Sequence, residues 1–296
     1  MSESPKNDRD DVTGVETTGH EWDGIRELNN PLPKWWLYTF YACIIWSFAY
    51  WVVMPTWPYL STEGWTYTKG VIGYDQREVV TRELGSIAEG RADEMQQIAT
   101  LAPEDVAGNA ALMEVALAAG KAAFGDNCAP CHGSGAQGSW GFPNLNDDVW
   151  LWGGTLEDIR YTATHGIRWE ADDNTRQNVM MAYGRDGILA RGEIADVAEF
   201  VLALSRQPND AEAAARGADI FGEQCVTCHG ADGQGNRELG APNLTDAVWL
   251  YGGDRASIIE TVSNGRSGVM PAWGGRLDAG TINALTLYVH SLGGGE

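Results

Sequence analysis

The chain has 296 residues and a formal net charge of −21 from 20 basic and 41 acidic side chains. This length has room for about two or three small domains. The acidic balance excludes a nucleic-acid-binding protein, which would carry a basic stripe, and instead suits a basic protein partner. Four of the five cysteines belong to two short motifs described below, so no disulfide framework is predicted.

Residues 1–33 are predicted to form a mobile acidic tail, because so few apolar side chains cannot bury a core. Residues 34–56 are predicted to form a transmembrane helix. Trp35 to Met54 is a run of 20 residues without a charge, and such a helix matches a hydrocarbon core of about 30 Å. Cys43 lies inside this run and is interpreted as a small apolar side chain.

An uncleaved anchor is favoured over a signal peptide, because the apolar run starts far from Met1 and no small-residue cleavage site follows it. A buried core helix is the weaker interpretation, since the run has no polar face. Residues 57–110 follow as a connector, which we expect to lie against a partner or the membrane surface.

Two copies of the pattern C-x-x-C-H occur 97 residues apart. They comprise Cys128, Cys131 and His132, and Cys225, Cys228 and His229. In this pattern, two thiols one helical turn apart bond covalently to haem c, and the following imidazole becomes the proximal iron ligand. Zinc is disfavoured, because it would need four soft ligands at one point. A thiol redox pair is disfavoured by the histidine that follows each copy directly.

The sequence around each motif is repeated with an offset of 99 residues in its best-matching blocks. Residues 111–206 and 207–296 each read as helix, haem motif, short helix, Met-containing loop and final helix. This order is typical of a small cytochrome c domain. The predicted fold is therefore mainly α, with one N-terminal transmembrane helix followed by two tandem cytochrome c domains that bind two haem c groups.

Each repeat offers a methionine as the sixth iron ligand. Met270 lies 41 residues after His229, and Met180 lies 48 residues after His132. A thioether is a soft ligand that raises the haem potential and suits electron transfer. Met181 and His165 remain rival ligands in the first repeat. The spacing does not decide whether each methionine serves its own repeat, although local closure is the simpler expectation.

The combination of acidic tail, aromatic span, connector from Trp57 to Tyr74 and tandem haem motifs resembles the di-haem cytochrome c subunit (subunit III, CcoP/FixP type) of bacterial cbb3-type cytochrome c oxidases. The resemblance runs from about residue 20 to the end. The chain departs from it at Met181, where the family's Met loop usually has proline.

This resemblance implies a single-pass protein of the bacterial inner membrane, with a cytoplasmic N-terminus and periplasmic haem domains. Electrons would come from a soluble or membrane-tethered donor cytochrome c. They would pass through the two haems to a mono-haem cytochrome c subunit and the haem–copper catalytic subunit. Residues 111–296 carry 24 acidic and 12 basic side chains, a balance that would steer a basic donor.

No catalytic acid or base and no open metal site is recognised, so the isolated chain is expected to be an electron conduit and not an enzyme. Three alternatives remain. The chain could serve another dehydrogenase or reductase, or it could be a haem-based gas sensor or peroxidase with a displaceable sixth ligand. The span and connector could also act chiefly to assemble and hold a complex, with the haems secondary.

Overall fold

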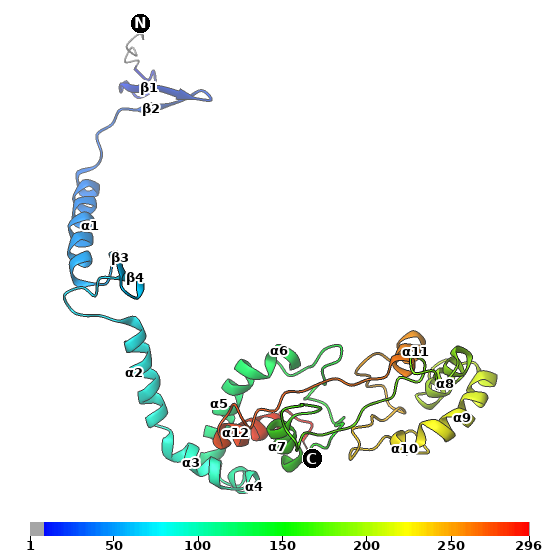
Figure 1. Cartoon of the computed structure of the whole chain (residues 1–296). Helices are drawn as coiled ribbons and strands as arrows, with labels where there is room; N and C mark the ends of the chain where they lie inside the picture. Colours follow the sequence, from blue (N-terminus) through cyan, green and yellow to red (C-terminus); the bar gives the residue numbers. More distant parts are fainter. Residues whose placement is uncertain (1–8, 296) are drawn as a thin grey trace. The chain divides into compact units, whose positions relative to one another are not determined.

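The computed structural model describes residues 9–295, and the first eight residues of the predicted tail lie outside this range. Two compact units divide the chain between Ile87 and Ala88. The elements of each unit can be followed in Figure 1. The first unit holds the predicted span, and the second holds both haem motifs.

The first unit begins with an antiparallel hairpin of β1 (Thr17–Trp22) and β2 (Ile25–Leu28). The prediction of an unstructured tail is therefore wrong for this segment. Asp23 and Gly24 both have positive φ, of 50° and 83°, which is the geometry of a two-residue hairpin turn whose twist matches that of the flanking strands. A two-stranded hairpin buries very few side chains, so the polar composition of this segment did not indicate strands.

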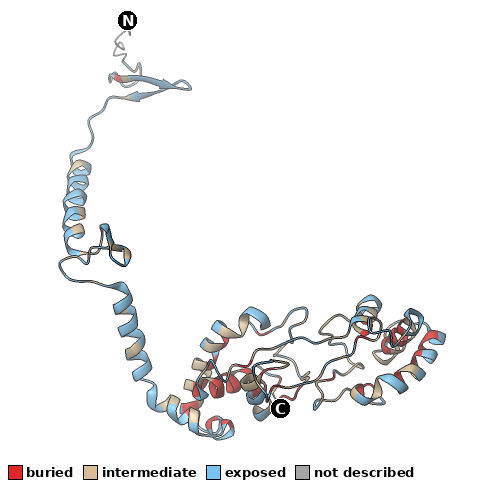
Figure 2. Cartoon of the chain, viewed as in Figure 1, coloured by how far each residue is buried: buried red, intermediate tan, exposed pale blue. Residues whose placement is uncertain are grey.

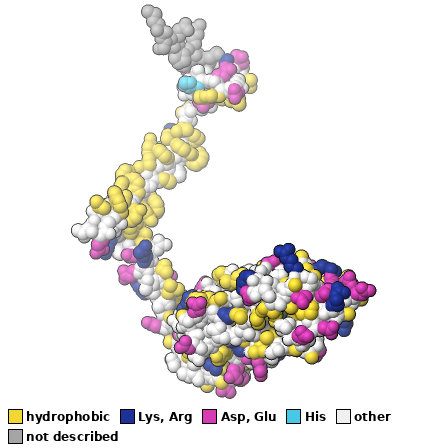
Figure 3. All heavy atoms as spheres, turned by 45° about the vertical axis from the view of Figure 1, so that its right-hand side comes forward, with side chains coloured by type: hydrophobic (Ala, Val, Ile, Leu, Met, Phe, Trp, Pro, Cys, Tyr) yellow, Lys and Arg dark blue, Asp and Glu magenta, His cyan; other side chains and the backbone are white. Residues whose placement is uncertain are grey.

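Helix α1 (Lys34–Val53) follows, with no buried residue along its 20 positions. Hydrophobic side chains cover its visible face (Figure 3). It is the one helix in the described residues that is long and apolar enough to cross a membrane. After α1, strands β3 (Pro58–Ser61) and β4 (Gly64–Tyr67) form a second hairpin. The amide of Val71 then donates to the carbonyl of Val52 at 3.0 Å, so the connector caps the end of the helix.

Helix α2 (Gln76–Glu89) leads into the second unit, whose ordered elements are all helical. These are α3 (Ala92–Thr100), α4 (Pro103–Ala107), α5 (Ala110–Asn127), α6 (Ala129–His132), α7 (Leu156–His165), α8 (Arg191–Leu204), α9 (Ala211–Gln224), α10 (Val226–His229), α11 (Arg255–Asn264) and α12 (Ala279–His290). The expected mainly α fold with one N-terminal apolar helix is confirmed.

The last part of the predicted connector belongs to this second unit. Ile98 on α3 and Val106 on α4 are fully buried in a cluster with Leu112 of α5 and Leu287 of α12. The buried amide of Asn283 donates to the carbonyl of Ile98 at 2.8 Å. These helices therefore pack on the helices around the first haem motif, whereas the whole connector was expected to lie against a partner or the membrane surface.

The helices of the two sequence repeats pair crosswise. Helix α5 of the first repeat packs on α12 of the second, while α9 of the second repeat packs on α8 of the first. A glycine lies at each crossing: a Cβ at Gly120 would overlap the carbonyl oxygen of Ala284, and a Cβ at Gly217 would overlap that of Asp196. Only glycine permits backbones this close, so the two crossings are equivalent, and each joins one repeat to the other.

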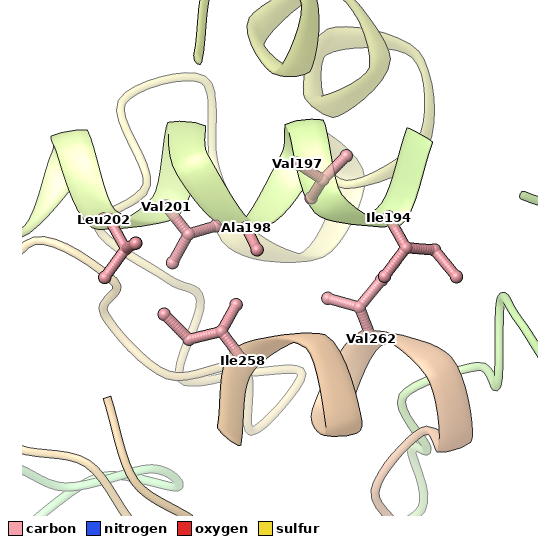
Figure 4. Close-up of a cluster of buried hydrophobic side chains, with 7 residues drawn as sticks. All are labelled: Ile194, Val197, Ala198, Val201, Leu202, Ile258 and Val262. Carbon is pink, nitrogen blue, oxygen red and sulfur yellow. The ribbon is translucent and has the colours of Figure 1, made fainter. Parts of the chain in front are cut away.

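We call the helices packed around each haem motif a haem unit. A buried cluster in the second haem unit shows the same exchange of helices between the repeats. Helix α8 supplies Ile194, Val197, Ala198, Val201 and Leu202, and α11 supplies Ile258 and Val262. Figure 4 shows the side chains of α8 facing those of α11. Buried residues gather on α12 and α8 in Figure 2. Each haem unit is thus built from the N-terminal half of one repeat and the C-terminal half of the other.

Candidate haem sites

Each haem motif lies on one short helical turn that continues from a longer helix. In the first copy, the amide of Cys128 donates to the carbonyl of Phe124 at 2.8 Å, and the amide of His132 donates to the carbonyl of Cys128 at 2.9 Å. Gly133, with φ of 83°, ends the turn. This turn brings both thiols and the imidazole to one end of α5. The second copy repeats the pattern, with Gly230 in the place of Gly133.

The two histidines are fixed in the state that iron requires. Nδ1 of His132 lies 3.0 Å from the carbonyl oxygen of Pro143, and Nδ1 of His229 lies 3.1 Å from that of Pro242. A carbonyl oxygen only accepts, so Nδ1 must donate, which leaves Nε2 unprotonated as a ligand atom. Burial lowers the pKa of both imidazoles, which keeps them neutral and able to bind a metal ion.

Burial raises the pKa of Cys128 and of Cys225 to about 11. Both thiols are therefore protonated near neutral pH.

A pocket that is partly open to solvent lies beside the first motif. Its wall is largely apolar and includes Cys128, His132, Trp150, Trp152, Ile159, Leu285 and Val289. An apolar pocket lined by the Cys128 thiol and the His132 imidazole fits a haem group covalently attached at one edge. When bound, haem c supplies one-electron redox chemistry.

The methionine in the wall of this first pocket is Met270, from the second repeat. Trp273, on the same loop, also lines the pocket. The backbone of Met270 is held there by Ile167, through paired hydrogen bonds of 2.9 and 3.0 Å. The expectation of local closure is therefore wrong for this loop.

Met180 lies correspondingly in the second haem unit, where it packs against the cluster formed by α8 and α11. Its backbone pairs with that of Arg266. Three residues further on, the hydroxyl of Tyr183 donates to the carbonyl of Gln224 at 2.8 Å, directly before Cys225. Burial and the nearby Cys225 thiol raise the pKa of Tyr183. The first repeat's Met loop therefore lies against the second haem motif.

The two rival ligands of the first repeat point elsewhere. Met181 is 51 % exposed, whereas Met180 is partly buried. Nδ1 of His165 lies 3.0 Å from a carboxylate oxygen of Asp172, and the His165 ring lies against Tyr161. Asp172 has its pKa lowered by this hydrogen bond to His165. These contacts hold His165 outside the lining of the pocket beside His132.

Sequence reasoning missed three supporting groups. The carbonyls of Pro143 and Pro242 orient the histidines, and Tyr183 ties one Met loop to the other repeat. A signal for the prolines was present, because both open the repeated block P-N-L that follows each haem motif. Nothing in the spacing indicated the role of Tyr183.

Comparison with known proteins gives three matching family models. Residues 14–61 match the N-terminal domain of cytochrome oxidase-cbb3, FixP. Residues 117–205 match cytochrome c, and residues 212–289 match cytochrome c oxidase, cbb3-type, subunit III. The matches thus cover the hairpin and span, the first repeat and the second repeat.

Curated relatives match almost the whole chain. The cbb3-type cytochrome c oxidase subunit FixP of Azorhizobium caulinodans is 55% identical over 97% of this chain and 96% of its own length. Subunit FixP of a Bradyrhizobium species is 52% identical over 97% and 98% of the two chains. Subunit CcoP of Azospirillum brasilense is 51% identical over 98% and 99%. The chain therefore belongs to the FixP/CcoP family of cbb3-type cytochrome c oxidase subunits, the di-haem electron-transfer subunits of that oxidase.

Proposed function

We propose that this chain holds two covalently attached haem c groups and that each would take its methionine ligand from the other sequence repeat. Cys128, Cys131 and His132 hold the first together with Met270, and Cys225, Cys228 and His229 hold the second together with Met180. The observation that carries this proposal is that Met270 lines the pocket beside His132. With a histidine and a methionine on each iron, both sites are suited to one-electron exchange and not to gas binding.

The chain's own residues would tune both sites toward electron transfer. The carbonyls of Pro143 and Pro242 hold each imidazole as an Nε2 ligand and increase its basicity. Apolar walls such as Trp150 and Leu285 limit the contact of the first site with water, which disfavours the more highly charged oxidised state. Both effects are reached without a catalytic acid or base, so the isolated chain acts as a conduit and the reduction of oxygen belongs to another subunit.

The proposed route begins with a donor cytochrome c, soluble or membrane-tethered, and ends at the mono-haem and haem–copper subunits. Support for donor docking comes from the excess of acidic side chains over residues 111–296, which attracts a basic protein. Helix α1 would anchor the chain in the bacterial inner membrane with lipid around it. The N-terminal hairpin would be cytoplasmic and the haem units periplasmic, since covalent haem attachment takes place outside the cytoplasm in the family that the chain resembles.

The ligand exchange can be tested in full-length chains that carry one haem each. A chain with Cys225→Ala and Cys228→Ala keeps the first site. In it, Met270→Leu should abolish the weak red charge-transfer absorption of methionine-ligated ferric haem and lower the midpoint potential, while Met180→Leu should leave both unchanged. The reciprocal chain, with Cys128→Ala and Cys131→Ala, should respond to Met180→Leu only.

The matched pair of methionine variants is its own control, because both remove one thioether from equivalent loops. Helical circular dichroism of each variant would check that the fold persists. If Met180→Leu removed the absorption from the first site, each repeat would be closed on itself and the exchange would be rejected.

A further inference from the structure

Arg168 lies where the two repeats cross. It directly follows Ile167, whose backbone pairs with that of Met270. Its own amide donates to the carbonyl of Arg176 at 2.9 Å. Its φ of 51° is in the left-handed region, a costly conformation for a residue with a β-carbon. Such a conformation persists only where the surroundings enforce it.

The guanidinium of Arg168 contacts both Met loops. Its Nε donates to the carbonyl of Gly268 at 2.6 Å, and its Nη1 donates to the carbonyl of Asn178 at 2.5 Å. Gly268 lies two residues before Met270, and Asn178 lies two residues before Met180. One side chain therefore binds the two loops at the same position relative to each methionine.

The equivalent position in the second repeat cannot make this contact. With the repeat offset of 99 residues, the counterpart of Arg168 is Ser267, whose short side chain has no fork of donors. The neighbouring Arg266 is engaged otherwise, donating to the Thr261 hydroxyl at 2.7 Å and lying 4.2 Å from the centre of the Tyr251 ring. The planar guanidinium suits this bridging role because its donors point in fixed, divergent directions.

The Asn178 end of the bridge is itself tied to the second repeat. The side-chain amide of Asn178 donates to the carbonyl of Leu239 at 2.6 Å. Arg168 is thus attached to a loop that is anchored at a second point, so its contact restrains the position of Met180 and does not merely follow it.

We infer that Arg168 is a shared positioning residue, which holds both Met loops so that each thioether stays on its iron. The inference rests on the ligation proposed above. A thioether is a weak ligand, and partners that hold a weak ligand in place decide how fully the metal keeps it. Loss of this one side chain should therefore loosen both sixth ligands together, even though they belong to different haem units.

The test uses the full-length di-haem protein with Arg168→Gln, which keeps most of the length of the side chain but removes the charged fork. We expect the methionine-to-iron absorption to fall at both haems and both midpoint potentials to shift downward. Carbon monoxide binding by the ferrous protein should rise from near zero at both sites. Arg82→Gln is the matched control, because Arg82 is an exposed arginine paired with Glu78 one turn away on α2.

Arg168→Lys separates positioning from charge, since lysine keeps the charge but not the planar fork. Partial loss of the absorption at both haems is expected. Wild-type absorption and potentials in Arg168→Lys would show that charge alone suffices and would overturn the positioning role. This milder variant also serves if Arg168→Gln fails to accumulate.

A change confined to one haem in Arg168→Gln, or no change at either, would overturn the inference as well. Failure of the underlying ligation looks different, because the unaltered protein would then lack the methionine-to-iron absorption altogether. The two results are distinguishable in the same spectra.

Discussion

Cutting the chain between residues 206 and 207, at the boundary of its two sequence repeats, is expected to leave neither half folded. The fragment 207–296 would lose α8, which supplies Ile194, Val197, Val201 and Leu202 to the buried cluster on α11. Burial of each such side chain contributes about 1.5–3 kcal/mol, so the loss is about 6–12 kcal/mol. This is comparable to the whole stability of a typical domain, about 5–15 kcal/mol.

The assay compares three chains produced with haem attachment: 88–296, 88–206 and 207–296. Circular dichroism should show cooperative thermal unfolding for 88–296 only, and only this chain should show the methionine-to-iron absorption. Covalent haem alone does not discriminate, because thioether bonds can form on an unfolded chain. A fragment 207–296 that unfolds cooperatively and carries this absorption would refute the interleaved packing.

Three further predictions address the packing, the helix ends and the surface charge. Ile258→Ala, in the contact of α11 with α8, should lower the free energy of unfolding by about 2–5 kcal/mol in denaturant titrations, and a change below about 1 kcal/mol would contradict the burial of this side chain. Changing Asp278, which caps α12, to Ala should lower the free energy of unfolding by about 0.5–2 kcal/mol, whereas Asn, which also caps a helix, should change it little. Hydrogen bonding to Thr281 lowers the pKa of Asp278 below 3.8, so its contribution is full above that pH and is lost as the pH falls through the lower, folded value; Asp278→Asn should flatten this acid limb of the stability curve. Electron transfer from a basic donor should slow as ionic strength rises through about 0.1 M, where the Debye length is about 10 Å, and a rate independent of salt would argue against steering by the acidic surface.

The groups that carry the chemistry were predictable because each depends on short spacing. C-x-x-C-H places its ligands on one helical turn, a charge-free run of 20 residues is long enough to span a membrane, and a repeated Met loop is recognised within a few residues. The exposure of Met181 then separated it from Met180, a distinction that the sequence left open.

The crossing of the repeats could not be predicted, because the packing faces are nearly equivalent. The final helices of both repeats carry apolar side chains at similar spacing: Ile194, Val197 and Val201 in one, and Ile282, Leu285 and Val289 in the other. Gly120 and Gly217 offer the same close approach to either of them. Local and exchanged pairings therefore satisfy the same pattern, and periodicity cannot choose between them. The predicted boundaries 111–206 and 207–296 remain a description of the repeat in the sequence, since each haem unit takes helices from both sides of them.

Two segments of the chain lead from one haem unit to the other, and they differ in length. The shorter segment requires the two haem units to lie close together. From Gly166 to Met180 the chain takes 14 residues, but from Gly265 to Met270 it takes only five. Five extended residues span at most about 18 Å, and this segment leads from the end of α11, in the second haem unit, to the pocket of the first. The short segment thus limits the separation of the sites, while the longer one supplies Arg168 and Asn178, which tie the two Met loops together. A hinge between the haem units would require both segments to release at once, so we expect electron relay through this chain to proceed at a fixed geometry without a domain motion.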